Sequence, residues 1–314
     1  MEDKPLVSIA INNYNYARFL GEAIDSALNQ TYPHTEVIVV DDGSTDNSRE
    51  IIASYGDKII PLLKENGGQA SAFNAGFAAS KGDIICFLDA DDMFLPEKAA
   101  EIVDAFGSSP DLGWCFHALK WVDDNGKPLN PKNSHEGESI SKNGFPKREY
   151  DLRADIKKGK LKNKLAHLPS TTALCFSRSL LQQILPMPEA KRIGLNDGYL
   201  EFTAIGLSKG LMLDKELALY RVHGSNAYSM RNDRQKVQAR IGTITGYWLR
   251  VKFPDFSKFA NNLVGTGLGM YWRAGGVEEE YRELVKNHLA SVTLPEKVEI
   301  YARAAFNYLK NTTF

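Results

Sequence analysis

Short runs of consecutive apolar residues alternate, along the first part of the chain, with segments in which apolar residues recur every three or four positions. The continuous runs fall at 6–11, 36–40, 59–63 and 84–88. Runs of this kind are typical of strands that are buried on both faces of a parallel sheet. Between the first two runs, apolar residues have the spacing of a helix with one apolar face: Phe19, Leu20, Ala23, Ile24 and Ala27. The alternation predicts an α/β fold with a central, mostly parallel sheet flanked by helices and connected by right-handed crossovers.

Polar loops follow three of these predicted strands, at 12–16, 41–44 and 89–92. Open α/β sheets bind their ligands at the carboxyl ends of the strands, so the three loops predict one binding site. The last loop holds Asp89, Asp91 and Asp92 without a cation among them. Because like charges repel at close range, a divalent cation with bound phosphates is the simplest partner for them. The alternative is a polar turn that caps the following helix.

After this point the pattern becomes less regular. Strands are predicted at 113–121, 171–177 and 211–219, with hairpin turn chemistry at 123–127. Residues 130–164 are polar and predict a long excursion from the fold.

Beyond Met230 the pattern indicates helices, at 235–253, 256–271, 278–289 and 295–309, which predicts a C-terminal helical appendage. The glycines at 265, 267 and 269 have the spacing of a nucleotide-binding loop, but no predicted strand precedes them. Close packing of one helix on another is the better interpretation.

Composition and charge limit the possible partners and the compartment of the protein. The chain has 314 residues, 43% of them hydrophobic, and a formal net charge of −1, so no overall field favours nucleic acid or a membrane. Cys86, Cys115 and Cys175 lie in apolar stretches, which indicates buried free thiols of a reducing compartment. Without a signal peptide or a run of about 20 apolar residues, the sequence predicts a cytoplasmic protein. The basic segment 157–164 is either a solvated surface or a contact for an anionic acceptor or membrane surface.

The polar loops suggest specific chemistry. The exposed ring of Tyr14 beside a carboxylate suits a flat heterocycle, with Asp42 accepting a hydrogen bond from a base N–H. Asp91 would hold a metal that bridges two phosphates, and Asp89 would reach a ribose hydroxyl or the water shell of the metal. Asp92 is a candidate cap for the next helix.

Taken together, these segments resemble the family 2 glycosyltransferases, which have the GT-A nucleotide-sugar fold. The matching motifs cover residues 1–95 and occur in the same order as in the family. They are Val-Ser-Ile at 7–9, Tyr-Asn at 14–15, the segment 36–46, Asn-Gly-Gly-Gln at 66–69, Asn-Ala-Gly at 74–76 and the segment 82–92. Weaker matches at Asn196-Asp197 and at 220–226 extend the resemblance to about residue 228.

The resemblance implies inverting transfer of a sugar from a nucleoside diphosphate donor, with a UDP-sugar favoured. It implies that the nucleotide contacts Asn12, Tyr14, Asp42, Gln69, Asn74, Asp89 and Ala90. It places Mn²⁺ or Mg²⁺ on Asp91 and His223, and the catalytic base at Asp197, which would deprotonate the acceptor hydroxyl. Taken alone, Asp197 would be a helix cap and His223 a surface residue.

The resemblance also implies a GT-A domain at 1–228, with a nucleotide half at about 1–95 and an acceptor half at about 96–228, followed by the helical extension 229–314. The expected acceptor is a saccharide or lipid-linked saccharide of bacterial cell-surface polysaccharide or O-antigen assembly. Peripheral contact with the inner face of the membrane is expected, and nucleic acid is not an expected partner.

Three positions depart from the family's pattern. Asn12 stands where many relatives have Pro, Phe73 where Arg is frequent, and Asn196 where Glu commonly precedes the base. Without this arginine, the negative charge of the diphosphate would have to be neutralised by the metal or by another cation such as Arg221.

The departures keep a second hypothesis open: a non-catalytic or degenerate module that binds nucleotide sugars. A sugar nucleotidyltransferase is disfavoured because a Gly-rich phosphate loop with Arg and Lys is missing near the N-terminus. A Rossmann dehydrogenase is excluded because no Gly-x-Gly-x-x-Gly follows the first strand.

Overall fold

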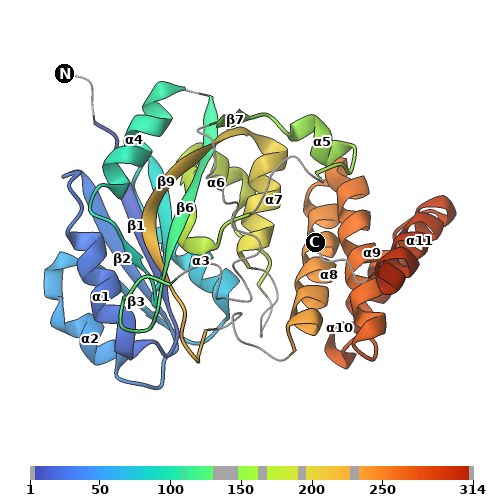
Figure 1. Cartoon of the computed structure of the whole chain (residues 1–314), viewed down its shortest axis with the longest axis horizontal. Coiled ribbons are helices and arrows are strands. Elements are labelled where there is room, and N and C mark those ends of the chain that lie inside the picture. Colours follow the sequence, from blue (N-terminus) through green and yellow to red (C-terminus); the bar gives the residue numbers. More distant parts are fainter. Residues whose placement is uncertain are drawn as a thin grey trace.

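A sheet with strand order β3-β2-β1-β4-β8-β6-β9-β5, in which β7 also pairs with β9, forms the centre of the molecule (Figure 1). The structure is a computed structural model that describes residues 4–109, 111–129, 148–161, 168–189, 196–226 and 233–310. Most of the predicted excursion, at 130–147 and 162–164, lies outside the described residues.

The first four strands in this order are parallel, as the apolar runs predicted. They are β3 (Ile60–Lys64), β2 (Thr35–Asp42), β1 (Val7–Asn13) and β4 (Ile84–Asp89). In register, Asn12 lies opposite Asp89, and Asn13 lies opposite Asp41. The polar ends of β1, β2 and β4 therefore meet at one edge of the sheet, which confirms the predicted convergence of the three loops.

The remaining strands are mostly antiparallel. They are β8 (Leu174–Ser177), β6 (Leu112–Val122), β9 (Lys209–Arg221), β5 (Met93–Phe94) and β7 (Arg148–Tyr150), and among them only β6 and β9 run parallel to one another in the described structure. Pairing of β8 with β4 brings the second half of the chain beside the acidic strand end. The sequence predicted β6, β8 and β9 without their partners.

Helices cover both faces of the sheet because alternate residues of each strand point to opposite sides. In β1, Ile9 and Ile11 share a core with α1 (Ala17–Leu28), α2 (Ser48–Ser54) and α4 (Lys98–Ser108). Ala10, between them, belongs to the core on the other face, with α3 (Gln69–Ala79), α6 (Arg178–Ile184) and α7 (Asp197–Leu207).

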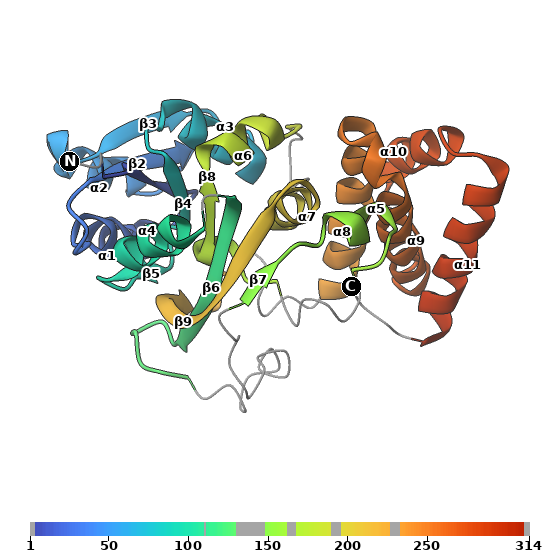
Figure 2. The ribbon, with the colours of Figure 1, turned by 90° about the horizontal axis from the view of Figure 1, so that it is seen from above.

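Four helices after residue 233 lie to one side of the sheet, as Figure 2 shows from above. They are α8 (Arg234–Lys252), α9 (Ser257–Arg273), α10 (Glu279–Ala290) and α11 (Leu294–Lys310), close to the predicted ranges. The short helix α5 (Arg153–Lys157) and α7 pack between them and the sheet. At this junction, the rings of Phe202 on α7 and Phe259 on α9 lie 5.0 Å apart, edge to face.

The glycines of α9 serve helix packing, as predicted. A Cβ at Gly267 would lie 2.3 Å from Thr243 Oγ1 of α8, and one at Gly269 would lie 2.5 Å from the carbonyl oxygen of Ala304 on α11. At Gly265 the nearest atom, the carbonyl oxygen of Ile300, would be 2.9 Å away. The missing side chains let α8 and α11 approach the backbone of α9 from two sides.

The cysteines are buried and unoxidised, and they lie next to one another: Cys175 of β8 is in register with Cys86 on one side and Cys115 on the other. In the described part of the chain, every helix is too short or too polar to cross a lipid bilayer.

Candidate active site

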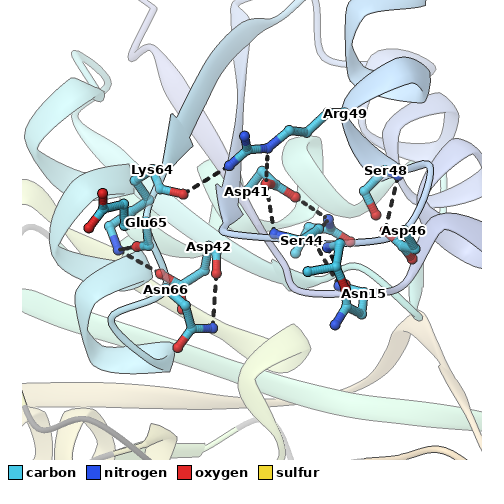
Figure 3. A network of polar contacts seen from close by, with 12 residues as sticks. Asn15, Asp41, Asp42, Ser44, Asp46, Ser48, Arg49, Lys64, Glu65 and Asn66 are labelled. Atoms are coloured by element: carbon cyan, nitrogen blue, oxygen red, sulfur yellow. Dashed lines mark hydrogen bonds and ion pairs between the residues drawn. The ribbon is translucent and has the colours of Figure 1, made fainter.

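The loops after β1 and β2 hold one another through side chains (Figure 3). Asn13 Nδ2 donates to Asp41 Oδ2 at 2.9 Å and to Ser44 Oγ at 3.1 Å, and the backbone N–H of Thr45 donates to Asn15 Oδ1 at 2.7 Å. Asn15 has a φ of 60°, which an asparagine tolerates better than most residues. The turn presents Tyr14 to solvent with 48% of its surface exposed, as a ring that stacks on a base requires.

Asp42 is almost fully buried, and its carboxylate organises the neighbouring loop. It accepts hydrogen bonds from the backbone N–H of Gly67 at 3.0 Å and of Gly68 at 2.8 Å. The ammonium of Lys64 lies 2.6 Å from Asp42 Oδ1 (Figure 3). Sequence reasoning missed Lys64 because its place opposite Asp42 is set by the register of β3 and β2, which no local sequence signal specifies.

Asn12 also lies at this edge. Its side-chain Nδ2 and Oδ1 are both buried, and neither has a hydrogen-bond partner within the described structure. An unpaired buried amide is costly, so a ligand that supplies its partners would gain free energy of binding. This fits the nucleotide contact that the sequence implied for Asn12.

The carboxylates after β4 reach different partners. Asp91 Oδ2 lies 3.0 Å from His223 Nε2 and 3.2 Å from Asn226 Nδ2. Asp92 does not cap the next helix, contrary to the sequence prediction: it accepts from Thr172 Oγ1 at 2.5 Å and from the backbone N–H of Arg221 at 2.8 Å. Burial, followed by the charge of Asp91, raises the pKa of Asp92 well above its ordinary value.

Asp89 and Asp197 come together at this edge from distant parts of the chain. Burial, and then the charges of Asp91, Asp92 and Asp197, raise the pKa of Asp89 well above its ordinary value. Asp197 begins α7, and burial raises its pKa as well. A partly buried carboxylate with a raised pKa is suited to accept a proton near neutral pH.

Glu201 is a carboxyl that sequence reasoning did not select. It follows Asp197 by one helical turn on α7, is 4% exposed, and its Oε1 has no hydrogen-bond partner in the described structure. Burial, followed by the charge of Asp197, raises its pKa well above the ordinary value. Its spacing of four residues from Asp197 was the available signal.

Arg221 does not replace the arginine lost at position 73, which corrects the sequence-based suggestion. It is 1% exposed. Its guanidinium donates to the carbonyl oxygens of Asp91 and Asp124, each at 2.9 Å, and to the carboxylate of Glu22. Phe73 is wholly buried with its ring centroid 4.8 Å from that of Phe87, so this departure serves the core.

The other residues that were predicted to contact the nucleotide have different partners in the structure. Gln69 Nε2 lies 3.5 Å from Thr171 Oγ1, at the site. The amide of Asn74 instead bridges to the backbone of Met187, donating at 2.9 Å and accepting at 2.7 Å. Ala90 is fully buried, so only its backbone is placed near the strand ends, where its N–H donates to the carbonyl of Asn12.

Asp91 and His223 have the chemistry of a cation site. Asp91 Oδ2 and His223 Nε2 lie 3.0 Å apart, and Ser225 contacts His223 Nδ1 through its Oγ at 2.9 Å and through its backbone N–H, which donates at 3.2 Å. A cation would have to replace the proton that Nε2 shares with Asp91. Within the described ranges, no three His, Cys, Asp or Glu side chains could hold a metal by themselves. Asp91 and His223 therefore fit Mn²⁺ or Mg²⁺ only if phosphate and water oxygens complete its ligands.

Comparison with known proteins identifies the family of the chain. The model of the family described as Glycosyl transferase family 2 matches residues 8–185. An uncharacterized glycosyltransferase of Nostoc sp. is 40% identical over 225 residues, which cover 70% of this chain and 66% of that protein. A Rickettsia typhi relative is matched over 56% of its length, so the chain spans less than two thirds of these curated relatives.

Solved structures show the fold. S. aureus TarS 1-349 in complex with UDP-GlcNAc superposes with a TM-score of 0.58 and 19% identity, covering 98% of this chain and 92% of that one. The mannosyltransferase PcManGT from Pyrobaculum calidifontis, in complex with GDP-Man and Mn²⁺, has a TM-score of 0.54 and 17% identity, covering 99% and 89%. The sheet and its flanking helices are those of the GT-A glycosyltransferases. Since its family model matches more than half of the residues, the chain belongs to glycosyl transferase family 2.

Proposed function

We propose that the protein transfers a sugar, with inversion, from a nucleoside diphosphate donor to a hydroxyl of an acceptor. The observation that carries the proposal is the alignment of the polar ends of β1, β2 and β4 at one sheet edge, with Asn12 opposite Asp89 and Asn13 opposite Asp41, where the charge of Asp197 also reaches Asp89. A base beside a diphosphate-binding edge is what such a displacement requires.

The base of the donor would stack on Tyr14 and meet Asp42 and Lys64. A carboxylate oxygen and an ammonium 2.6 Å apart offer an acceptor next to a donor. Uracil, thymine and guanine offer such a pair a ring N–H beside a carbonyl, and adenine and cytosine offer it an amino N–H beside a ring nitrogen. The likeness to a protein that binds UDP-GlcNAc favours a UDP-sugar.

The diphosphate would lie over Asp91 and His223, with Asp89 near the ribose. A divalent cation bound there would supply Lewis acidity that stabilises the departing diphosphate. The raised pKa values of Asp89 and Asp92 indicate that these carboxyls hold protons readily when no positive charge compensates them.

In the reaction, Asp197 would accept the proton of the acceptor hydroxyl as that oxygen attacks the anomeric carbon. The attack comes from the face opposite the diphosphate, which leaves with the electron pair of the broken bond. The new bond therefore has inverted configuration.

The acceptor would approach from the side of residues 96–228 and the helices at 229–314. Family membership favours a saccharide or lipid-linked saccharide of a bacterial cell-surface polysaccharide, reached at the inner face of the membrane. Lys157, in the basic segment considered for such contact, pairs with Asp255 at 2.7 Å, and residues 162–164 lie outside the described residues.

The first test is calorimetric titration with UDP, GDP and dTDP, each with and without Mn²⁺. We expect one nucleotide to bind tightly and only with the metal. Asp91→Asn is the matched variant, since it keeps the size of the side chain, and it should lose the metal-dependent part of binding. Failure of all three nucleotides to bind with Mn²⁺ present would contradict the proposal.

A second measurement separates an enzyme from a degenerate binding module. The enzyme should release nucleoside diphosphate from UDP-GlcNAc or another donor sugar, slowly with water and faster with an acceptor. A module that only binds would show the calorimetric signal and no release.

A further inference from the structure

The helix α11 has apolar residues on two sides. Its buried side packs on α9 through Ile300 and Ala304. Ten large hydrophobic side chains are exposed in the described part of the chain, and six of them lie on α11: Leu294, Val298, Tyr301, Phe306, Tyr308 and Leu309. A seventh, Trp272, lies in the last turn of α9. Because a surface helix ordinarily has one apolar side, toward the core, a second apolar side indicates a surface that binds a partner.

These seven side chains form one surface, which we call the outer face. With 3.6 residues per turn, the six on α11 lie within an arc of roughly 160° of the helix. The ring of Trp272 joins them, at 6.4 Å from that of Tyr301 and 6.4 Å from that of Tyr308. Figure 2 shows α11 at the opposite end of the molecule from α2. The outer face is therefore remote from the donor edge of the sheet.

The segment that carries the outer face is basic, although the whole chain is nearly neutral. Residues 229–314 contain 13 Lys and Arg against 8 Asp and Glu, whereas the whole chain has 38 against 39. An unequal distribution of charge between two parts of a chain is typical of a contact with an anionic partner.

A pocket of about 390 Å³ between α10 and α11 concentrates both properties. Its lining includes three aliphatic and three basic side chains: Val277, Val285, Leu289, Arg282, Lys286 and Lys297. Lys286 pairs with the exposed Glu283 at 3.2 Å, and no acid among the described residues forms an ion pair with Arg282 or Lys297. Lys297 precedes Tyr301 by one helical turn, so the pocket adjoins the outer face.

The composition of this region favours a lipid surface over a second copy of the chain. Trp and Tyr are enriched where a bilayer meets water, and interfacial helices combine such rings with neighbouring basic residues. A second copy would bring another basic segment against the first, and like charges oppose that contact. An anionic bilayer has the complementary charge.

We propose that the outer face and the adjoining basic pocket dock the protein on an anionic membrane surface. The apolar side chains of α11 enter the boundary between headgroups and acyl chains, and Arg282, Lys286 and Lys297 meet lipid phosphates. The inference rests on the proposed function for its purpose, since docking would hold the enzyme where a lipid-linked acceptor lies.

The test is cosedimentation of the full chain with lipid vesicles in the absence of donor. We expect binding to vesicles with about 30% phosphatidylglycerol in phosphatidylcholine to exceed binding to phosphatidylcholine alone by at least about tenfold. Binding to the anionic vesicles should weaken as NaCl rises from about 0.1 to 0.5 M, because salt screens the attraction.

Two variants separate the apolar from the charged contribution. Val298→Gln combined with Leu309→Gln should weaken binding to the anionic vesicles by at least about tenfold. Each basic residue near an anionic surface contributes about fivefold, so Gln at Arg282, Lys286 and Lys297 together should cost on the order of 10²-fold and remove the preference for anionic lipid.

Val251→Gln combined with Leu63→Gln is the matched control. It exchanges the same two residue types at positions 52% and 53% exposed, on α8 and β3, outside the outer face. Its binding should stay within about twofold of the parent. Since all four positions are exposed, both double variants should melt close to the parent.

Brominated lipid provides a second measurement, because it quenches the fluorescence of a tryptophan that it contacts. Brominated anionic vesicles should quench the parent, and Trp272→Phe should lose most of that quenching. Parent-like binding of the Val298/Leu309 variant, equal binding to vesicles with and without phosphatidylglycerol, or quenching that persists in Trp272→Phe would each overturn the inference.

A parent that ignores vesicles but sediments as a dimer, which the Val298/Leu309 variant does not form, would assign the outer face to a second copy and also overturn it. Vesicle binding needs no donor, so its failure leaves the proposed reaction standing. Failure of the nucleotides to bind would instead refute the proposed reaction and leave the docking measurement unchanged.

Discussion

Carboxyl groups at this site differ because their immediate neighbours differ. Asp42 is held by two backbone N–H groups and the ammonium of Lys64, whereas Asp197 is partly buried and receives backbone donors. Glu201 is buried with one unpartnered oxygen. The same type of group is therefore proposed to bind a base edge at Asp42 and to accept a proton at Asp197, while at Glu201 burial raises its pKa.

The role of Asp197 predicts a selective loss. Asn in its place keeps the shape and an oxygen that can accept from the backbone N–H of Gly198, but it cannot take up a proton. We expect Asp197→Asn to bind the nucleoside diphosphate within about threefold of the parent and to lose on the order of 10²- to 10⁴-fold in transfer. Calorimetry and nucleotide release measure the two quantities, and transfer at the parent rate would show that the base is another group.

The raised pKa of Asp197 adds a pH dependence to this reaction. The base works only when ionised, so kcat/KM of the parent should fall as pH drops through a value above the ordinary 3.8.

Glu201 predicts a pH-dependent stability. Its pKa is raised in the folded state, so between the ordinary value of 4.5 and the raised value the folded protein holds a proton that the unfolded chain releases. The contribution of Glu201 to the free energy of unfolding is therefore fully present below pH 4.5. It falls by about 1.4 kcal/mol per pH unit as pH rises from 4.5 towards the raised pKa. Glu201→Gln, which is always neutral, should melt higher than the parent at pH 8 and no higher at pH 4.

Glu149→Gln provides the control, because Glu149 is exposed on β7. Its melting temperature should differ from the parent by the same small amount at both pH values. A Glu201→Gln variant that follows this control would contradict a protonated Glu201.

At the scale of elements, the site depends on which strands are neighbours. Parallel pairing of β1 with β2 and β4 aligns three polar strand ends, and antiparallel pairing of β8 with β4 brings the 3-10 turn η3 (Thr171–Ala173) against β4. The C-terminal helices show a second kind of constraint, in which glycines set how close two backbones come.

That constraint predicts opposite effects for two glycines. At Gly267 a methyl group would meet Thr243 Oγ1 at 2.3 Å and the carbonyl oxygen of Ala239 at 2.8 Å, so Gly267→Ala should lose about 1–3 kcal/mol of unfolding free energy. Gly107, in α4, has open space within 4 Å of where a methyl group would stand, so Gly107→Ala should gain up to about 1 kcal/mol. Urea unfolding measures both, and equal stability of the Gly267 variant and the parent would refute the close packing.

For the whole molecule, the segments 1–228 and 229–314 remain our proposed functional division, but they share a hydrophobic core. One continuous cluster includes Phe87 of the sheet, Leu200 of α7, and Leu249 and Phe259 of α8 and α9. Because this core crosses the boundary between the segments, we expect the two segments to unfold cooperatively.

We therefore expect one heat-capacity peak on thermal unfolding of the full chain. Phe259→Ala, at a residue 6% exposed that packs edge to face on Phe202, should lower the temperature of that peak without dividing it. Two separate peaks, in the parent or in the variant, would show that the helical segment folds independently.

The sequence by itself determined the longer strands, most of the helices and the polar strand ends, because an apolar run or a helical period is a local property of the chain. The short elements β5, β7 and α5 were not predicted. Asp42, Asp89 and Asp91 could be identified from the sequence in this way, since each lies at or just after the end of a strand. Resemblance to the family was needed to single out Asp197 and His223, which lie in sequence contexts that also suit a cap or a surface loop.

Only the tertiary structure decided which groups share an environment. Lys64 beside Asp42, Thr172 between Asp89 and Asp92, and the burial of Arg221 all depend on strand order and register. The same holds for Phe73, whose place in the core explains a departure that the sequence alone indicated as a lost phosphate contact. Hydrogen bonds and pKa shifts arise from groups within a few ångströms, and separation along the chain does not specify that distance.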